Sequence, residues 1–163
     1  MALRNRGDLM KEKSEKNLSR TISKRTIHAP RFLNEADEYG SAFSRGLRLD
    51  LGPYTFVSIS GTASIDRCGR TYGPGDFLKQ VQRTYENLSA LLSNAGVTWR
   101  DVIKTRCYLK NMKYYKKFNQ YRSCFYEKLK LTPFPASVCV QAVLCRPELL
   151  VEIEVEVVCK RTR

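Results

Sequence analysis

Four side chains in the last quarter of the sequence could together bind an acid and activate water. Ser137 and Cys139 lie two residues apart in the apolar stretch PFPASVCV, Arg146 lies in a short polar turn, and Glu152 begins the alternating run EIEVEVV. A guanidinium can hold a carboxylate through charge-assisted hydrogen bonds, and a glutamate can polarise a water molecule. Side chains two apart in a strand share a face, and the connection between the strands that carry Cys139 and Glu152 is short. We therefore expect these two strands to pair antiparallel and to form one wall of an acid-binding pocket between subunits.

Each of these residues also has a purely structural interpretation. Cys139 could be an ordinary buried thiol, and no histidine lies near it in the sequence to activate it as a nucleophile. Glu152 is one of three alternating glutamates, which is the pattern of a solvated sheet face. Arg146 could be a surface charge in a loop. Both interpretations stay open at this point.

The composition narrows the available chemistry. The 163 residues are enough for one well-buried domain, and 42% are hydrophobic and 28% charged, as in ordinary globular proteins. The six cysteines form no CxxC pair, and His28 is the only histidine. This pattern argues against a structural zinc site and against a serine–histidine–aspartate triad. We therefore expect neither a metal nor a cofactor.

The sequence also indicates a cellular location. No apolar run is long enough to span a bilayer, and residues 1–16 lack the apolar segment of a signal peptide. Without such a signal, the cysteines are expected to be reduced thiols. We expect a cytoplasmic protein with no membrane partner.

The net charge of +13 makes nucleic acid a candidate partner. Much of this charge lies near the N-terminus, where basic residues alternate with serine and asparagine. This composition predicts a basic, disordered tail over residues 1–35, able to bind nucleic acid weakly and without specificity, and one domain over residues 36–163. The later segment YLKNMKYYKKFNQYR could stack bases on its aromatic rings. Its helical spacing favours instead a helix with a core-facing side: Met112, Tyr115, Phe118, Tyr121 and Phe125.

Strand and helix patterns alternate along the rest of the chain. Strands are predicted over residues 55–65, 101–110, 136–143 and 149–158. Helices are predicted over residues 77–96, with Asp76 as N-cap and Gly96 as C-terminal stop, and over the aromatic segment. This order predicts an α+β fold with one mixed sheet and both helices on one face.

The predicted sheet has apolar residues on both faces, but two helices can cover only one. The residues that indicate this are Val57, Ile59, Thr105, Val138 and Val140. Further copies of the same chain are the simplest cover for the second face.

Several short motifs, in their order along the chain, resemble the reactive intermediate deaminase (RidA-like) family of small trimeric proteins. They are SGTASI, ENLSALLSNAG, DVIKTRCYLKNM, FPASVCV and LLVEIEVEVV, within roughly residues 40–158. The resemblance implies a chorismate-mutase-like fold in a homotrimer with a central barrel, and ligand sites between subunits. It also implies cofactor-free hydrolysis of enamines and imines to a 2-oxo acid and ammonia.

The resemblance assigns roles to five positions of this sequence. In the family pattern a cysteine supplies a backbone contact and a glutamate on the last strand positions water, and these correspond to the catalytic candidates Cys139 and Glu152. An aromatic turn residue corresponds to Phe43. A Ser-Gly turn corresponds to Ser60 and Gly61.

One position departs from the family pattern. The arginine that follows Pro-Ala and binds the substrate carboxylate is replaced by Ser137. Losing such a partner typically costs about 2–5 kcal/mol of binding free energy. Arg146 is the best substitute in the sequence, and Arg45 and Arg70 are weaker candidates. The smaller serine also leaves room for a substrate bulkier than a three-carbon imine.

Three functions are compatible with this sequence. The first is a 2-iminobutanoate/2-iminopropanoate-type deaminase in which Arg146 replaces the missing arginine. The second is a ligand-binding or regulatory relative without hydrolysis, which Ser137 favours and whose ligand could be an aromatic acid. The third is an RNA-binding protein.

Overall fold

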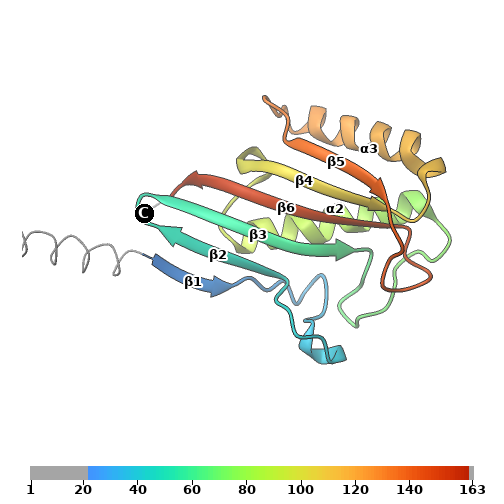
Figure 1. The fold of residues 1–163 in the computed structure, drawn as a ribbon, viewed down its shortest axis with the longest axis horizontal. Helices are drawn as coiled ribbons and strands as arrows, with labels where there is room; N and C mark the ends of the chain where they lie inside the picture. Colours follow the sequence, from blue (N-terminus) through green and yellow to red (C-terminus); the bar gives the residue numbers. More distant parts are fainter. Residues whose placement is uncertain (1–21, 162–163) are drawn as a thin grey trace, which may run out of the picture.

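A six-stranded sheet with the order β1-β2-β3-β6-β4-β5 forms the body of the protein (Figure 1). The computed structural model describes residues 22–161, except for the side chain of Tyr39. Neighbouring strands run antiparallel apart from β4 and β5, which run parallel. The strands are β1 (Ile22–Thr26), β2 (Gly46–Leu51), β3 (Tyr54–Ala63), β4 (Val102–Leu109), β5 (Ala136–Gln141) and β6 (Val151–Lys160).

Two α-helices accompany this sheet within the described residues: α2 (Phe77–Asn94) and α3 (Tyr115–Lys128). Short 3-10 turns are η1 (Asp37–Tyr39), η2 (Trp99–Asp101) and η3 (Met112–Tyr114). The Asp76 side chain caps α2 by accepting from Lys79 N, and Gly96 follows the helix with a φ of +72°. None of the described helices has the length and apolar character needed to cross a membrane. The predicted α+β fold with one mixed sheet is thus confirmed.

The core lies between the helices and one face of the sheet. The apolar side chains of β6 that face the helices are Val151, Ile153, Val155 and Val157, each at most 1% exposed. They share one buried cluster with residues of β3, β4 and both helices. The alternation in the sequence predicted which side of β6 is buried, because successive strand residues point to opposite faces.

The core-facing side of α3 differs in part from the sequence prediction. Phe118 is fully buried and Tyr121 and Phe125 pack against the core, but Met112 and Tyr115 are 40% and 41% exposed. The α-helix begins only at Tyr115, after the 3-10 turn η3, so the 3.6-residue period does not extend back to Met112.

The predicted antiparallel pairing of the last two strands is wrong. β5 pairs in parallel with β4, with Ser137 opposite Thr105, and β6 lies between β3 and β4. The ten-residue β6 carries a fully buried apolar row and gains hydrogen bonds on both edges in this central position. β5 is mostly exposed and forms the sheet edge.

Residues 22–35, which composition alone assigned to the tail, are part of the folded domain. β1 pairs with β2 from Ile22 opposite Leu51 to Thr26 opposite Leu47. The next residues bury Ile27, Ala29 and Leu33 in the core cluster. Three buried apolar residues among polar ones attach this segment to the core, and the average composition of 35 residues does not reveal them. Residues 1–21 lie outside the described residues.

The face of the sheet away from the helices combines charged and apolar side chains. Arg106 donates to Glu156 Oε1 at 2.7 Å, and the Tyr108 hydroxyl donates to Glu154 at 3.0 Å. Exposed apolar residues that alternate onto this face are Leu51, Tyr54, Val138, Val140 and Val158. Val57, Ile59 and Thr105 point to the helices instead. The expected apolar surface on the second face is therefore confined to parts of it.

Candidate functional site

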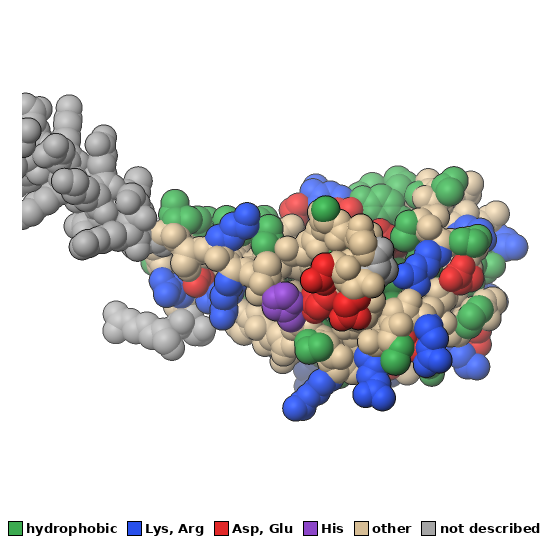
Figure 2. Space-filling model, turned by 90° about the horizontal axis from the view of Figure 1, so that it is seen from below, with side chains coloured by type: hydrophobic (Ala, Val, Ile, Leu, Met, Phe, Trp, Pro, Cys, Tyr) green, Lys and Arg blue, Asp and Glu red, His purple; other side chains and the backbone are tan. Residues whose placement is uncertain are grey.

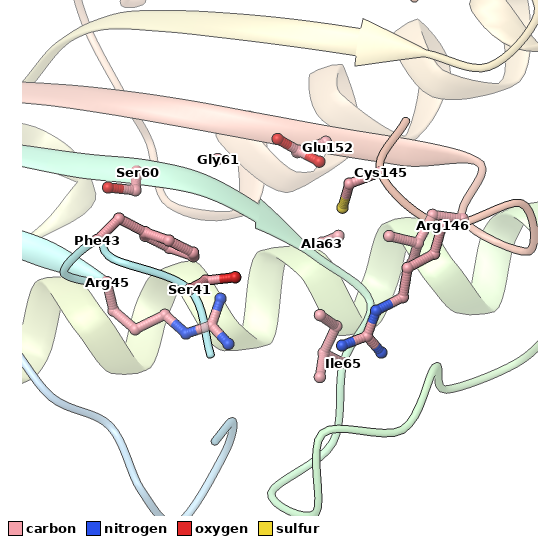
Figure 3. A pocket seen from close by; sticks show the side chains of 11 residues that line it. Ser41, Phe43, Arg45, Ser60, Gly61, Ala63, Ile65, Cys145, Arg146 and Glu152 are labelled. Carbon is pink, nitrogen blue, oxygen red and sulfur yellow. The ribbon is translucent and has the colours of Figure 1, made fainter. Parts of the chain in front are cut away.

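A cavity of about 520 Å³ lies at the end of β3, beside the beginning of β6 (Figure 3). Its walls come from the segment before β2, from β3 and from the loop before β6. The lining residues are Ser41, Phe43, Arg45, Ser60, Gly61, Ala63, Ile65, Cys145, Arg146, Leu149 and Glu152. Five of the seven site residues predicted from the sequence thus meet in one cavity: Phe43, Ser60, Gly61, Arg146 and Glu152.

Gly61 and Glu152 are in close contact. A Cβ atom on Gly61 would lie 2.0 Å from Glu152 Oε1, so the carboxylate rests where any other residue would place its side chain. The pairing of β3 with β6 is irregular between Ile59 and Thr62, which brings Gly61 into this position. Because Gly61 has no Cβ, it leaves the space that the Glu152 carboxylate occupies.

Glu152 lies in a desolvated environment. Burial raises the pKa of its carboxyl, the neighbouring Glu154 raises this pKa further, and the positive charge of Arg45 lowers it. A glutamate with a raised pKa is a stronger base when ionised than one in water. Glu152 is consequently the titratable group in this cavity best suited to exchange a proton with water.

Arg45 is held rigidly at the cavity wall and is only 2% exposed. Its Nε donates to the Asn34 carbonyl oxygen at 2.8 Å, and its Nη2 donates to Asn34 Oδ1 at 3.1 Å. Its guanidinium lies 5.4 Å from the centre of the Phe43 ring. Next to it, Ser60 Oγ donates to the Ser44 carbonyl at 2.7 Å and ties this segment to β3. The sequence alone ranked Arg45 behind Arg146, because its distance along the chain from Glu152 gave no sign of contact.

The loop that carries Arg146 is anchored by buried contacts. Arg146 Nη1 donates to the Gly69 carbonyl at 2.6 Å. Gln80, a fully buried residue of α2, donates to the Glu148 carbonyl at 2.9 Å and accepts from Leu150 N at 2.9 Å. These bonds fix the loop against α2, and they bring Arg146 to the same cavity as Glu152. Cys145, which was not among the residues predicted from the sequence, lines the cavity beside Arg146.

Ser137 and Cys139 do not line this cavity within one chain, and their predicted place in a pocket between subunits stays a prediction. β4 separates β5 from β6. Ser137 Oγ accepts from Arg122 Nη1 at 2.9 Å and from Thr105 Oγ1 at 3.0 Å. Arg122 was not predicted from the sequence, since only tertiary packing brings α3 to the edge of β5.

Cys139 lies beside Cys107, its partner in the parallel pair of β4 and β5. Burial, followed by the charge of Cys107, raises the pKa of the Cys139 thiol to about 11. At neutral pH this thiol is protonated and is a poor nucleophile. The backbone contact that the family pattern implies for Cys139 stays a prediction.

Arg70, the other weak candidate, lies outside the cavity lining. Its side chain is 77% exposed and pairs with Asp66 at 3.2 Å. Because it belongs to the loop that holds Arg146, it provides a matched control for substitutions of Arg146.

Figure 2 shows how charges are distributed over one side of the molecule. Lysine and arginine side chains are spread around this view, and acidic side chains gather beside the histidine. His28 Nδ1 lies 3.1 Å from Glu35 Oε2 in this region. No continuous basic stripe crosses the described part of this face. Nucleic-acid binding by the basic tail remains a prediction, since residues 1–21 are not described.

Comparison with known proteins gives a consistent family match. Residues 41–159 match the family described as "Endoribonuclease L-PSP". A RutC family protein from Pyrococcus abyssi is 31% identical over 111 residues, which cover 64% of this chain and 84% of that protein. The 3-aminoacrylate deaminase RutC from Acinetobacter baylyi is 30% identical over 97 residues, which cover 60% of this chain and 74% of that protein.

Solved structures show the same fold. The crystal structure of TdcF from E. coli with bound serine superposes with a TM-score of 0.68 at 22% sequence identity. The match covers 85% of this chain and 99% of TdcF. Residues 41–159, which match the family, include every residue that lines the cavity described above.

Proposed function

The chain belongs to the endoribonuclease L-PSP family, also called the YjgF/RidA/RutC family, and we propose that its cavity hydrolyses enamines or imines of 2-oxo acids. The observation that carries this proposal is the partly buried Glu152 carboxylate, held against Gly61 in a cavity with two arginines. The name of the RutC relative supports it, because 3-aminoacrylate is an enamine that carries a carboxylate.

The proposed reaction needs only water and a proton shuttle. Glu152 accepts a proton from a water molecule as the water oxygen bonds to the iminium carbon. The proton then passes to the amine nitrogen of the resulting carbinolamine. The carbon–nitrogen bond breaks and ammonia leaves as the hydroxyl oxygen forms a double bond to carbon. Glu152 takes the hydroxyl proton and passes it to the ammonia, so one ammonium ion is released for each water consumed. General acid–base catalysis of this kind contributes about 10²–10⁴-fold in rate.

Binding of the substrate carboxylate is assigned to Arg146. Ser137 stands where the family pattern has an arginine, and a hydroxyl cannot replace its paired charge-assisted hydrogen bonds. Arg146 lines the cavity with Glu152, and its loop is anchored to α2 through Gln80. Its guanidinium can therefore hold an acid at a fixed position relative to the water on Glu152.

We also propose that a neighbouring copy of the chain completes the site in a homotrimer with a central barrel. β5 is an unpaired sheet edge on one side, and Val138 and Val140 are exposed along it. Such an edge with apolar side chains is suited to burial against another copy. Ser137 and the backbone of Cys139 would then line the cavity of the neighbouring chain.

A direct assay tests the proposed function. The imines of 2-oxo acids are generated in situ by amino-acid oxidases, and loss of the imine and release of ammonia are followed. We expect the protein to accelerate imine loss and Arg146→Ala to raise KM at least tenfold, while Arg70→Ala leaves KM unchanged. Ser137→Arg should raise activity on the three-carbon imine. Unchanged kinetics in Arg146→Ala would show that Arg146 does not bind the substrate carboxylate. If the protein accelerates the loss of no imine, the proposed hydrolysis is rejected.

Substitution of Gly61 tests the placement of Glu152. In Gly61→Ala the new Cβ displaces the flexible carboxylate, so we expect kcat to fall by about tenfold to a hundredfold, as for other small misplacements of a reacting group. The melting temperature should change little, because the end of a side chain can move aside. Adding Gly61→Ala to Glu152→Gln should cause no further loss of activity. Independent, multiplicative losses would show that Gly61 acts by another route.

Ligand binding without turnover is the second candidate function, and the observation that favours it is Ser137 in place of the arginine. In that case the parent protein binds 2-oxo acids and hydrolyses no imine. The same assay, combined with calorimetry, separates the two functions.

A further inference from the structure

An arginine of α3 lies at the exposed edge of the sheet. α3 and β5 lie side by side at one margin of the sheet (Figure 1), and the partly buried Arg122 donates from Nη1 to Ser137 Oγ at 2.9 Å. Its Nη2 donates to Asn119 Oδ1 at 2.6 Å, and its guanidinium lies 5.3 Å from the centre of the Phe118 ring. Phe118 itself is fully buried. These contacts together fix the guanidinium of Arg122 beside β5.

No carboxylate within residues 22–161 forms an ion pair with Arg122. Arg106, on the neighbouring strand β4, is paired with Glu156 at 2.7 Å. The positive charge of Arg122 acts instead on the thiols beside it. Burial, followed by the charge of Cys107, raises the pKa of the Cys139 thiol, and Arg122 lowers this pKa. A partly buried guanidinium without an acidic partner is suited to bind an anion from outside the chain.

The edge of β5 offers further hydrogen-bond donors. A guanidinium has five N–H donors, and bonds to Ser137 and Asn119 use those of Arg122 only in part. Ser137 Oγ accepts from Arg122 and from Thr105 Oγ1, so its own O–H is left to donate. Ser137 is exposed, and β5 is the last strand of the described sheet. An anion at this edge can therefore reach both Arg122 and Ser137.

We infer that Arg122 is a substrate-binding residue, which binds the ligand carboxylate in the cavity of a neighbouring chain. The inference rests on the proposed homotrimer, in which Ser137 of one chain lines the cavity of the next. Ser137 stands where the family pattern has an arginine, and Arg122 brings a guanidinium to this place from a different element. Arg146 belongs to the chain that forms the cavity. A carboxylate accepts hydrogen bonds on both of its oxygen atoms, so the two arginines can share it.

Calorimetry on the full chain at pH 7 tests this role without turnover. The ligand is 2-oxobutanoate, a stable 2-oxo acid with one carboxylate. We expect Arg122→Gln to weaken its binding by about tenfold or more, because an uncharged amide cannot form the charge-assisted hydrogen bonds. Lys117→Gln, which removes an exposed charge from the same helix, should change the affinity by less than about twofold. Ser137→Arg added to Arg122→Gln should restore the affinity, since it returns a guanidinium to the same place.

Co-expression of two variants tests in which chain Arg122 acts. Arg122→Gln and Glu152→Gln are produced together at equal levels, and imine hydrolysis at low substrate concentration is compared with that of each variant alone. If each site combines Glu152 of one chain with Arg122 of its neighbour, about one site in four of a randomly assembled trimer carries both native residues. The mixture should then recover about a quarter of the parent activity. If both residues served the same chain, no site would recover.

Four results would overturn the inference in whole or in part. Affinity in Arg122→Gln like that of the parent, or a loss that Ser137→Arg does not restore, would exclude Arg122 as a binding residue. Dissociation of the trimer in Arg122→Gln, seen by sedimentation, would make it an assembly residue instead. No recovery in the mixture would overturn its placement in the neighbouring cavity. Weakened binding in Arg122→Gln, in a parent protein that hydrolyses no imine, would reject the proposed hydrolysis alone.

Discussion

Glu152→Gln should reduce kcat/KM for imine hydrolysis by about 100-fold or more, the usual contribution of a general acid–base group. Glutamine keeps the size and position of the side chain against Gly61 but cannot accept the proton from water. Glu156→Gln is the matched control, since Glu156 lies on the same face of β6 and binds Arg106 at 2.7 Å outside the cavity. That variant should retain turnover. Full activity in Glu152→Gln would exclude Glu152 as the proton acceptor.

The stability of Glu152→Gln distinguishes a catalytic residue from a structural one. Burial raises the pKa of Glu152 in the folded chain, so the folded state holds this proton more tightly than the unfolded state. The stabilisation from the protonated form is complete below about pH 4.3, the ordinary value for glutamate, and is lost as the pH rises through the raised pKa. At pH 7 the Gln variant should therefore melt at the same temperature as the parent or higher. Below about pH 4 the difference should disappear.

The same shift predicts the pH dependence of turnover. Proton acceptance requires ionised Glu152, so kcat/KM should rise with pH through a pKa above that of an ordinary glutamate. This rising limb should be absent from the residual activity of Glu152→Gln. If kcat/KM of Glu152→Gln still rises with pH in the same way, a group other than Glu152 causes the pH dependence.

Removal of residues 1–35 should destabilise the protein by at least about 4 kcal/mol, whereas removal of residues 1–21 should leave the melting temperature unchanged. The longer deletion takes away β1 and the buried side chains of Ile27 and Leu33. Truncating one buried side chain of this size to alanine typically costs about 2–5 kcal/mol, a large part of the stability of a small domain. Denaturant unfolding of both truncated chains measures the difference.

Point variants keep this prediction testable if the longer deletion does not fold. Ile27→Ala and Leu33→Ala should each lower the free energy of unfolding, and the exposed Ile22→Ala should have little effect. The longer deletion also removes Asn34, which holds the guanidinium of Arg45. Equal stability of the two truncated chains would show that residues 22–35 do not stabilise the folded domain.

Local sequence patterns predicted both α-helices, the strands β3 to β6 and the buried side of β6, but not β1 or β2. The alternation in β6, the capping residue Asp76 and the stop at Gly96 depend on neighbouring residues alone, so the sequence contains them directly. The ordered motifs also led to the family, and with it to four of the residues that line the cavity: Phe43, Ser60, Gly61 and Glu152. The replacement of the family arginine by Ser137 was likewise visible without a structure.

Tertiary structure decided which of these residues meet. The order of strands depends on how much apolar surface each one buries and on hydrogen bonding at both edges, and it placed β4 between Cys139 and Glu152. Residues 22–35 belong to the folded domain, although most of them are polar, because β1 pairs with β2 and because Ile27, Ala29 and Leu33 are buried in the core. Arg45 reached the cavity wall through its bonds to Asn34, and Arg122 reached Ser137 through the packing of α3 on the sheet edge. Such contacts join residues that lie far apart in the chain, so no local sequence pattern predicts them. The free energy that stabilises these contacts comes from burial and strand pairing over the whole fold.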